Sequence, residues 1–167
     1  MLTVTVLVGN PKAESKTLLL ARTLTAALLR GVEHDVGEID LAHHTGEVFD
    51  WTSATVSALN ERVAASDLVI VASPTYKAAY TGLLKAFLDR YPSNGLAGVV
   101  AVPVMTGGDL THALAVETSL RPLLVELGAS VPSRGLYFVA SRIEEVSTLV
   151  DEWVEANGAP VIRALGD

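Results

Sequence analysis

The feature that most constrains the fold is an alternation of short β-branched apolar runs with longer segments in which apolar residues recur at helical spacing. The apolar runs predict strands at residues 2–8, 34–41, 67–72, 98–105 and 131–139. The helical patterns cover residues 15–29, 53–65, 81–90, 110–127 and 143–157. Repeated strand–helix units require parallel strands, right-handed crossovers and helices on both faces. The sequence therefore predicts an α/β fold with a five-stranded parallel sheet in the order 2-1-3-4-5.

The length of the chain, 167 residues, predicts a single domain over residues 1–167. In a doubly wound sheet, ligands bind beyond the carboxyl ends of the strands, where the strand order reverses. The loops after the first, third and fourth strands are therefore the places where a site is expected.

Charge and cysteine content exclude several classes of function. The formal charge is −7, from 19 acidic and 12 basic residues, which disfavours binding along a nucleic-acid backbone. The chain contains no cysteine, which excludes disulfides, zinc–thiolate sites and cysteine nucleophiles. No apolar run is long enough to cross a membrane, and a secretory signal pattern is absent. A cytoplasmic protein with no membrane or nucleic-acid partner is expected.

The first loop, residues 9–17, reads Gly-Asn-Pro-Lys-Ala-Glu-Ser-Lys-Thr and leads into a helix. Helix N-termini present unpaired amides and a partial positive charge, which together suit a phosphate. The candidate ligands are Asn10, Lys12, Ser15, Lys16 and Thr17. The loop lacks the glycine pattern of a dinucleotide site and the Gly-Lys-Thr ending of a P-loop, so a monophosphate such as that of FMN fits it better. The alternative is an ordinary serine-capped helix with two solvated lysines.

The second loop follows the third strand and reads Ser-Pro-Thr-Tyr-Lys over residues 73–77. Pro74, Thr75 and Tyr76 are predicted to border a planar ring, with the backbone amides bonding its polar edge. Lys77 would offset the negative charge that a flavin acquires on reduction. The alternative is a proline-initiated turn in which Tyr76 covers the core and Lys77 lies in solvent.

The third loop consists of Thr106, Gly107 and Gly108 after the fourth strand. Paired glycines let the backbone approach a ligand closely. No bulky aromatic residue is present in this loop, which would leave one face of the ring open to a nicotinamide. Asp109, directly after it, is a candidate N-cap of the next helix.

Together the three loops resemble those of the NADPH-dependent FMN reductase family, whose fold is flavodoxin-like. Within that family they are most similar to the FMN reductases of two-component alkanesulfonate monooxygenase systems. Residues 9–17 resemble their Gly-Ser-Pro-Arg-x-x-Ser-Arg-Ser loop, residues 73–77 their Ser-Pro-x-Tyr-Lys loop, and residues 106–112 their Thr-Gly-Gly-x-x-x-His stretch.

The resemblance implies that NADPH or NADH passes hydride to FMN, and that reduced FMN serves a flavin-dependent monooxygenase. It implies that Asn10, Lys12, Ser15 and Thr17 hold the phosphate, with residues 74–77 and 106–108 around the ring. It also implies a homodimer or homotetramer packed through the helices after the third and fourth strands. Hydride transfer of this kind needs no catalytic acid, base or metal ligand. The adjacent His43 and His44 are accordingly expected to be solvated.

One departure from the family pattern leaves other functions open. Thr118 stands where the sulfonate-system reductases carry an inserted tyrosine, linked in that family to interface packing and flavin exchange. The first alternative is a flavoprotein with tightly bound FMN that reduces a quinone, azo, nitro or metal-oxyanion acceptor. A flavodoxin-type electron carrier is less favoured, because the first loop and the flanking aromatics of that class are missing. An interaction module without flavin is disfavoured by the retained hydroxyls and lysines.

Overall fold

A parallel sheet of five strands, in the order β2-β1-β3-β4-β5, forms the centre of the computed structural model, which describes residues 1–166. The strands are β1 (Leu2–Val8), β2 (His34–Asp40), β3 (Leu68–Pro74), β4 (Val100–Gly107) and β5 (Leu136–Val139). Every neighbouring pair runs parallel. The predicted fold class and strand order are confirmed.

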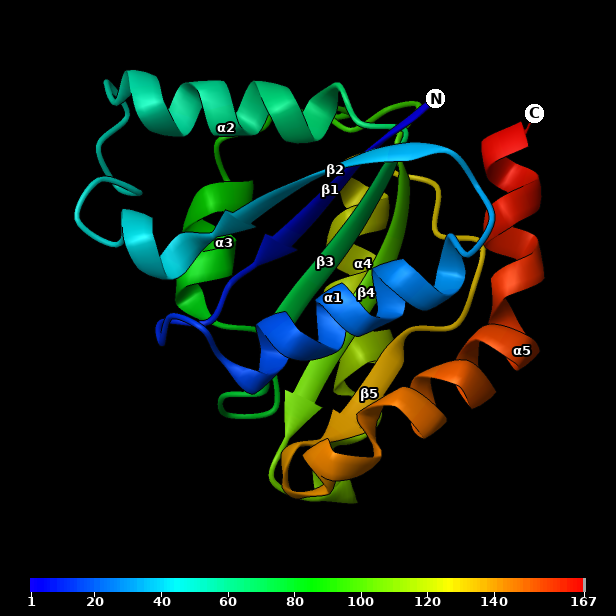
Figure 1. Cartoon of the computed structure of the whole chain (residues 1–167). Helices are drawn as coiled ribbons and strands as arrows, with labels where there is room; N and C mark the ends of the chain where they lie inside the picture. The colour runs from blue at the N-terminus through cyan, green and yellow to red at the C-terminus, as the bar shows by residue number, and fades with distance from the viewer. Residues whose placement is uncertain (167) are drawn as a thin grey trace.

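The helices form a layer on each face of the sheet (Figure 1). On one face lie α1 (Lys16–Leu28) and α5 (Val146–Gly166), and on the other α2 (Ala54–Ala64), α3 (Gly82–Leu88) and α4 (Arg121–Glu126). The alternation of side chains along β1 explains both layers, because Val4 and Val6 pack under α1 while Leu7 packs on the opposite face. β3 is buried along its whole length, as expected for the middle strand of a parallel sheet.

The prediction of a single helix over residues 110–127 is wrong. The segment contains a 3-10 turn (Leu110–His112), a π-helical turn (Val116–Leu120) and the short α4. The amide of Arg121 bonds the carbonyl of Val116, five residues earlier, which accommodates one extra residue in the turn. Two features oppose a regular helix here: Pro122 lacks an amide donor, and the hydroxyl of Ser119 donates to the carbonyl of Ala115.

The last strand and helix also differ from the expected bounds. β5 begins at Leu136, not residue 131, because Pro132 and Gly135 interrupt the pairing and the carbonyls of residues 131 and 133 accept bonds from Arg121. α5 begins at Val146, after a 3-10 turn over Ala140–Glu145, and continues to Gly166. It bends in its second half, where Pro160 supplies no amide donor (Figure 1). Within residues 1–166, no helix combines the length and apolarity needed to span a bilayer.

Candidate functional site

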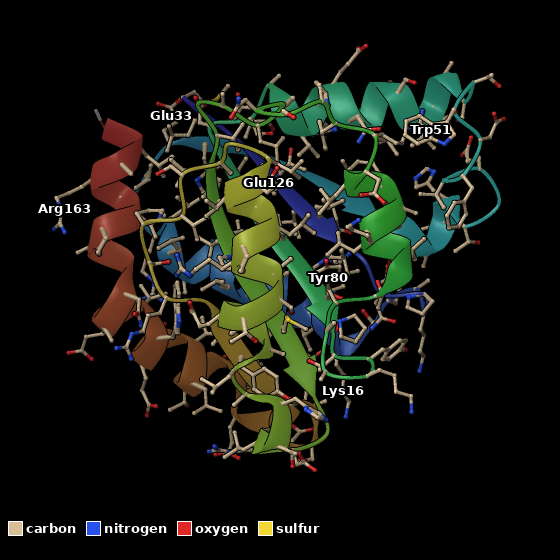
Figure 2. The ribbon with its side chains drawn as sticks, turned by 180° about the vertical axis from the view of Figure 1, so that it is seen from behind. Lys16, Glu33, Trp51, Tyr80, Glu126 and Arg163 are labelled. Carbon is tan, nitrogen blue, oxygen red and sulfur yellow. The ribbon has the colours of Figure 1, made fainter. Side chains whose placement is uncertain are left out.

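A cleft of about 340 Å³ lies at the carboxyl ends of β1, β3 and β4, where the three predicted loops meet. Figure 2 shows Lys16 at this end of the molecule and Glu33 at the opposite end. The predicted site residues that line the cleft are Asn10, Lys12, Ser15, Lys16, Thr17, Pro74, Thr75, Tyr76, Thr106, Gly107 and Gly108. Glu14 and Ala140, which no sequence motif indicated, also line it, whereas Lys77 does not.

Ser15 fixes the start of α1 and offers a donor to the cleft. Its Oγ accepts a hydrogen bond from the amide of Leu18 at 3.2 Å, so its own O–H remains available. The first amides of α1 have no acceptor within the helix and carry its positive end. Lys12 is exposed beside them, and Lys16 donates from Nζ to the carbonyl of Ala140 at 3.0 Å. This end of the cleft is therefore suited to an anion, despite the acidic character of the chain.

Buried hydrogen bonds join the first loop to the third. Asn10 Oδ1 accepts from the amide of Lys12 at 2.9 Å, and Asn10 Nδ2 donates to Thr17 Oγ1 at 3.1 Å. Thr17 Oγ1 lies 2.8 Å from Thr106 Oγ1. The carbonyl of Thr106 in turn accepts from the amide of Thr75 at 2.7 Å, which brings in the second loop. Asn10, Thr17 and Thr106 thus hold the three loops together as well as lining the cleft.

The second loop ends in a tight turn over residues 76–79. The amide of Tyr76 donates to the carbonyl of Ala79 at 2.9 Å, and the amide of Ala79 donates to the carbonyl of Tyr76 at 3.2 Å. Both central residues, Lys77 and Ala78, have positive φ, at 51° and 64°. Mirror-image turns of this type require such angles, which residues other than Gly and Asn rarely adopt. The turn leaves Tyr76 51% exposed, not covering the core, and places Lys77 at its tip.

This turn gives a direct stability prediction. Ala78→Gly should stabilise the protein by about 0.5–1 kcal/mol. Alanine is sterically strained at a φ of 64°, and this strain exceeds the unfolded-state entropy that glycine adds. Urea denaturation of the variant and the wild type measures the difference. Gly31→Ala is the matched control with the opposite sign: Gly31 also has positive φ, at 82°, and open space around it, so alanine there should destabilise by a similar amount. An Ala78→Gly protein less stable than wild type would contradict the prediction.

Glycine 107 allows Tyr137 to lie over the third loop. A Cβ at Gly107 would overlap the Tyr137 hydroxyl, which donates to the carbonyl of Asp109 at 2.9 Å. Asp109 caps the following turn, as expected, by accepting from the amide of Thr111 at 2.8 Å. Hydrogen bonds from the side chain and amide of Thr111 hold the pKa of Asp109 below its ordinary value. The loop is therefore fixed at both of its ends.

The donors of the cleft suit a molecule with a phosphate at one end and a planar ring at the other. Hydroxyl, amide and ammonium groups converge at Ser15 and the start of α1, whereas Pro74, Tyr76 and Gly107 border the other part. Within residues 1–166, the buried Oγ1 of Thr75 has no hydrogen-bond partner, so it is available to a ligand. The volume also falls in the range of cofactor sites, roughly 300–1,000 Å³. The residues present fit FMN.

Other histidine and aromatic side chains lie outside the cleft. His44 Nδ1 lies 3.2 Å from Glu47 Oε1, and residues 1–166 contain no group of three metal-ligating side chains. Trp51 is exposed beneath the guanidinium of Arg90 and remote from Lys16 in Figure 2. Tyr91 packs on the α2 side, where burial raises the pKa of its hydroxyl. None of these residues contributes to the cleft.

Three comparisons with known proteins agree with this geometry. Residues 2–143 match the family described as NADPH-dependent FMN reductase. The FMN reductase (NADPH) of Pseudomonas putida KT2440 is 35% identical over 142 residues, which is 81% of this chain and 70% of that protein. The NADH-dependent FMN reductase SfnF of Pseudomonas putida is 34% identical over 114 residues, 68% of this chain and 53% of SfnF. The apo structure of an NADH:FMN oxidoreductase (EMOB) superposes with a TM-score of 0.81 at 29% identity, covering 94% of this chain and 90% of that one.

Proposed function

Because the chain belongs to the NADPH-dependent FMN reductase family and is an NAD(P)H-dependent FMN reductase, we propose that it supplies reduced FMN to a partner monooxygenase. The observation that carries the activity is the cleft, in which three separate loops bring anion donors and a ring-binding surface together within the region that matches the family. The names of the relatives favour this function over a reductase with tightly bound FMN and a separate acceptor. We further propose that the chain acts as a single FMN-binding domain and that it does so in the cytoplasm.

Bound FMN supplies the ring that takes hydride from the nicotinamide of NADPH or NADH. The chain's own residues bind the flavin and orient it. The Ser15 hydroxyl, the first amides of α1 and the ammonium groups of Lys12 and Lys16 hold the phosphate. Asn10 and Thr17 keep the loop in the shape that presents those donors. Residues 74–76 and 106–108 border the ring. Lys77 lies exposed at the tip of the turn, outside the lining of the cleft, so it has no part in holding the ring.

The test of this function is anaerobic turnover. The purified protein is mixed with FMN in at least tenfold excess, with NADPH or NADH, and flavin absorbance is followed. Bleaching of the whole FMN pool supports a reductase that releases its flavin. Bleaching that stops at one flavin per chain favours the bound-flavin alternative, and no bleaching with either nucleotide contradicts the proposed function.

We also propose that the chain forms a homodimer or homotetramer through the helices after β3 and β4. The supporting observation is a set of exposed apolar side chains in the segment after β4, with Leu110 70%, Leu114 72% and Val125 55% exposed. Apolar side chains of this size gather where protein surfaces meet. Sedimentation velocity at several protein concentrations measures the assembly, and a monomer throughout would contradict it.

A further inference from the structure

We propose that Asp40 is a positioning residue that makes the anion loop, residues 9–17, selective for FMN over riboflavin. It would do so by holding Glu14 in a left-handed conformation directly before Ser15. The inference rests on the proposed function, since it assumes that the anion loop binds the phosphate of FMN. Neither Asp40 nor its contact was indicated by the sequence.

Glu14 occupies an unusual position in the backbone. Its φ is 48°, a left-handed value that residues other than Gly, Asn and Asp seldom adopt. Glu14 immediately precedes Ser15, the N-cap of α1, so its conformation sets the direction in which the chain enters the helix. Strained backbone of this kind persists only where surrounding contacts hold it.

Asp40, the last residue of β2, supplies such a contact. Its carboxylate accepts two amide hydrogen bonds, from Glu14 to Oδ2 at 3.3 Å and from Ala42 to Oδ1 at 3.1 Å. The side chain is nearly buried, with the residue 7% exposed. A buried carboxylate is costly unless its acceptors are used, and here one oxygen serves the turn after β2 while the other serves the anion loop.

A second contact holds the side chain of Glu14. Arg22 Nη1 donates to Glu14 Oε2 at 3.2 Å, while its Nε and Nη2 donate to the carboxylate of Glu38 at 2.6 and 2.7 Å. The bonds to Glu38, and secondarily the one to Glu14, raise the pKa of Arg22. Asp40 and Glu38 both belong to β2, so the edge strand holds Glu14 by its amide directly and by its carboxylate through Arg22.

The direction in which FMN affinity changes when the Asp40 carboxylate is removed distinguishes a positioning role from a purely electrostatic one. Asp40 is negative and hydrogen-bonded to the loop that would bind a phosphate dianion. If it acted only through its charge, removing that charge would tighten FMN binding. If it acts by holding Glu14, removing the acceptor weakens FMN binding. The two readings therefore predict opposite changes.

The experiment uses Asp40→Asn, which keeps the size of the side chain and one carbonyl oxygen but replaces the second acceptor by an NH₂ donor. FMN and riboflavin are titrated separately against each protein, with flavin fluorescence as the readout. The FMN Kd should rise about tenfold, the size expected for losing a hydrogen bond to a charged group, and the riboflavin Kd should stay within about twofold. Asp67→Asn is the matched control, because Asp67 Oδ2 accepts from the amide of Thr3 at 2.7 Å at the opposite end of the sheet. It should leave both Kd values unchanged.

A second variant tests the mechanism. Asn adopts left-handed φ more readily than Glu, so Glu14→Asn in the Asp40→Asn background should recover most of the lost FMN affinity. Glu14→Gln in the same background removes the same charge without that backbone preference, and it should not recover the affinity. Tighter FMN binding by Asp40→Asn, an equal loss for both flavins, no change, or absence of the recovery would each overturn the inference while the wild-type reductase activity stands. A wild-type protein that binds FMN no better than riboflavin would instead contradict the phosphate site itself, and the inference with it.

Discussion

The double substitution Lys12→Ala, Ser15→Ala is expected to weaken FMN binding about 100-fold, because it removes one cation and one hydroxyl donor from the anion end of the cleft. Charge-assisted hydrogen bonds of this kind contribute roughly 1.5–3 kcal/mol each. Riboflavin, which lacks the phosphate, should bind the variant and the wild type alike. Fluorescence titration with both flavins measures the effect.

The matched control for this variant is Lys85→Ala, Ser53→Ala. Ser53 caps α2 as Ser15 caps α1, accepting from the amide of Val56 at 3.1 Å, so both double variants lose a cap worth about 1 kcal/mol. Lys85 lies on α3 and bonds Asp89 away from the cleft. The control should lose similar stability and keep its FMN affinity. Equal FMN affinity in the two double variants would show that the phosphate binds elsewhere.

Gly9→Ala is expected to destabilise the protein by about 3 kcal/mol, because the new methyl group has no room and the backbone cannot retreat. A Cβ at Gly9 would overlap the Cβ of Leu84 and lie 3.1 Å from its Cα. The amide of Gly9 donates to the carbonyl of Ala72 at 2.8 Å, and its carbonyl accepts from the hydroxyl of Thr81. α3 therefore packs directly on the start of the anion loop. Urea denaturation measures the loss.

Gly82→Ala provides the comparison on the same helix. Gly82 is the first residue of α3, and a Cβ there would meet nothing within 4 Å. This variant should be as stable as the wild type or more stable by about 0.5–1 kcal/mol, because alanine favours the helix. A Gly9→Ala protein as stable as Gly82→Ala would mean that the loop and α3 separate easily.

Much of the site could be predicted because its residues carry local signals. Ser15 caps a helix, Pro74 ends β3 just before a turn, and Gly107 marks a close approach, and each motif follows a predicted strand. Parallel strands carry their carboxyl ends to one edge of the sheet, so the strand order alone brings the three loops together. Lys77 was the exception, because the turn geometry that moves it out of the cleft depends on positive φ at two residues that do not favour it.

The order of residue types along the chain was enough to predict the alternation of strands and helices, and with it the sheet order and the edge at which the site lies. These follow from periodicity and chain connectivity, which are local properties. Three contacts became visible only in the folded chain: the hydrogen bond from the amide of Glu14 to Asp40, the contact of Thr17 with Thr106, and the packing of Gly9 on Leu84. Each joins residues far apart in the chain, and each depends on distances that packing sets to within a few tenths of an ångström. A pattern of residue types along the chain does not encode distances of that kind.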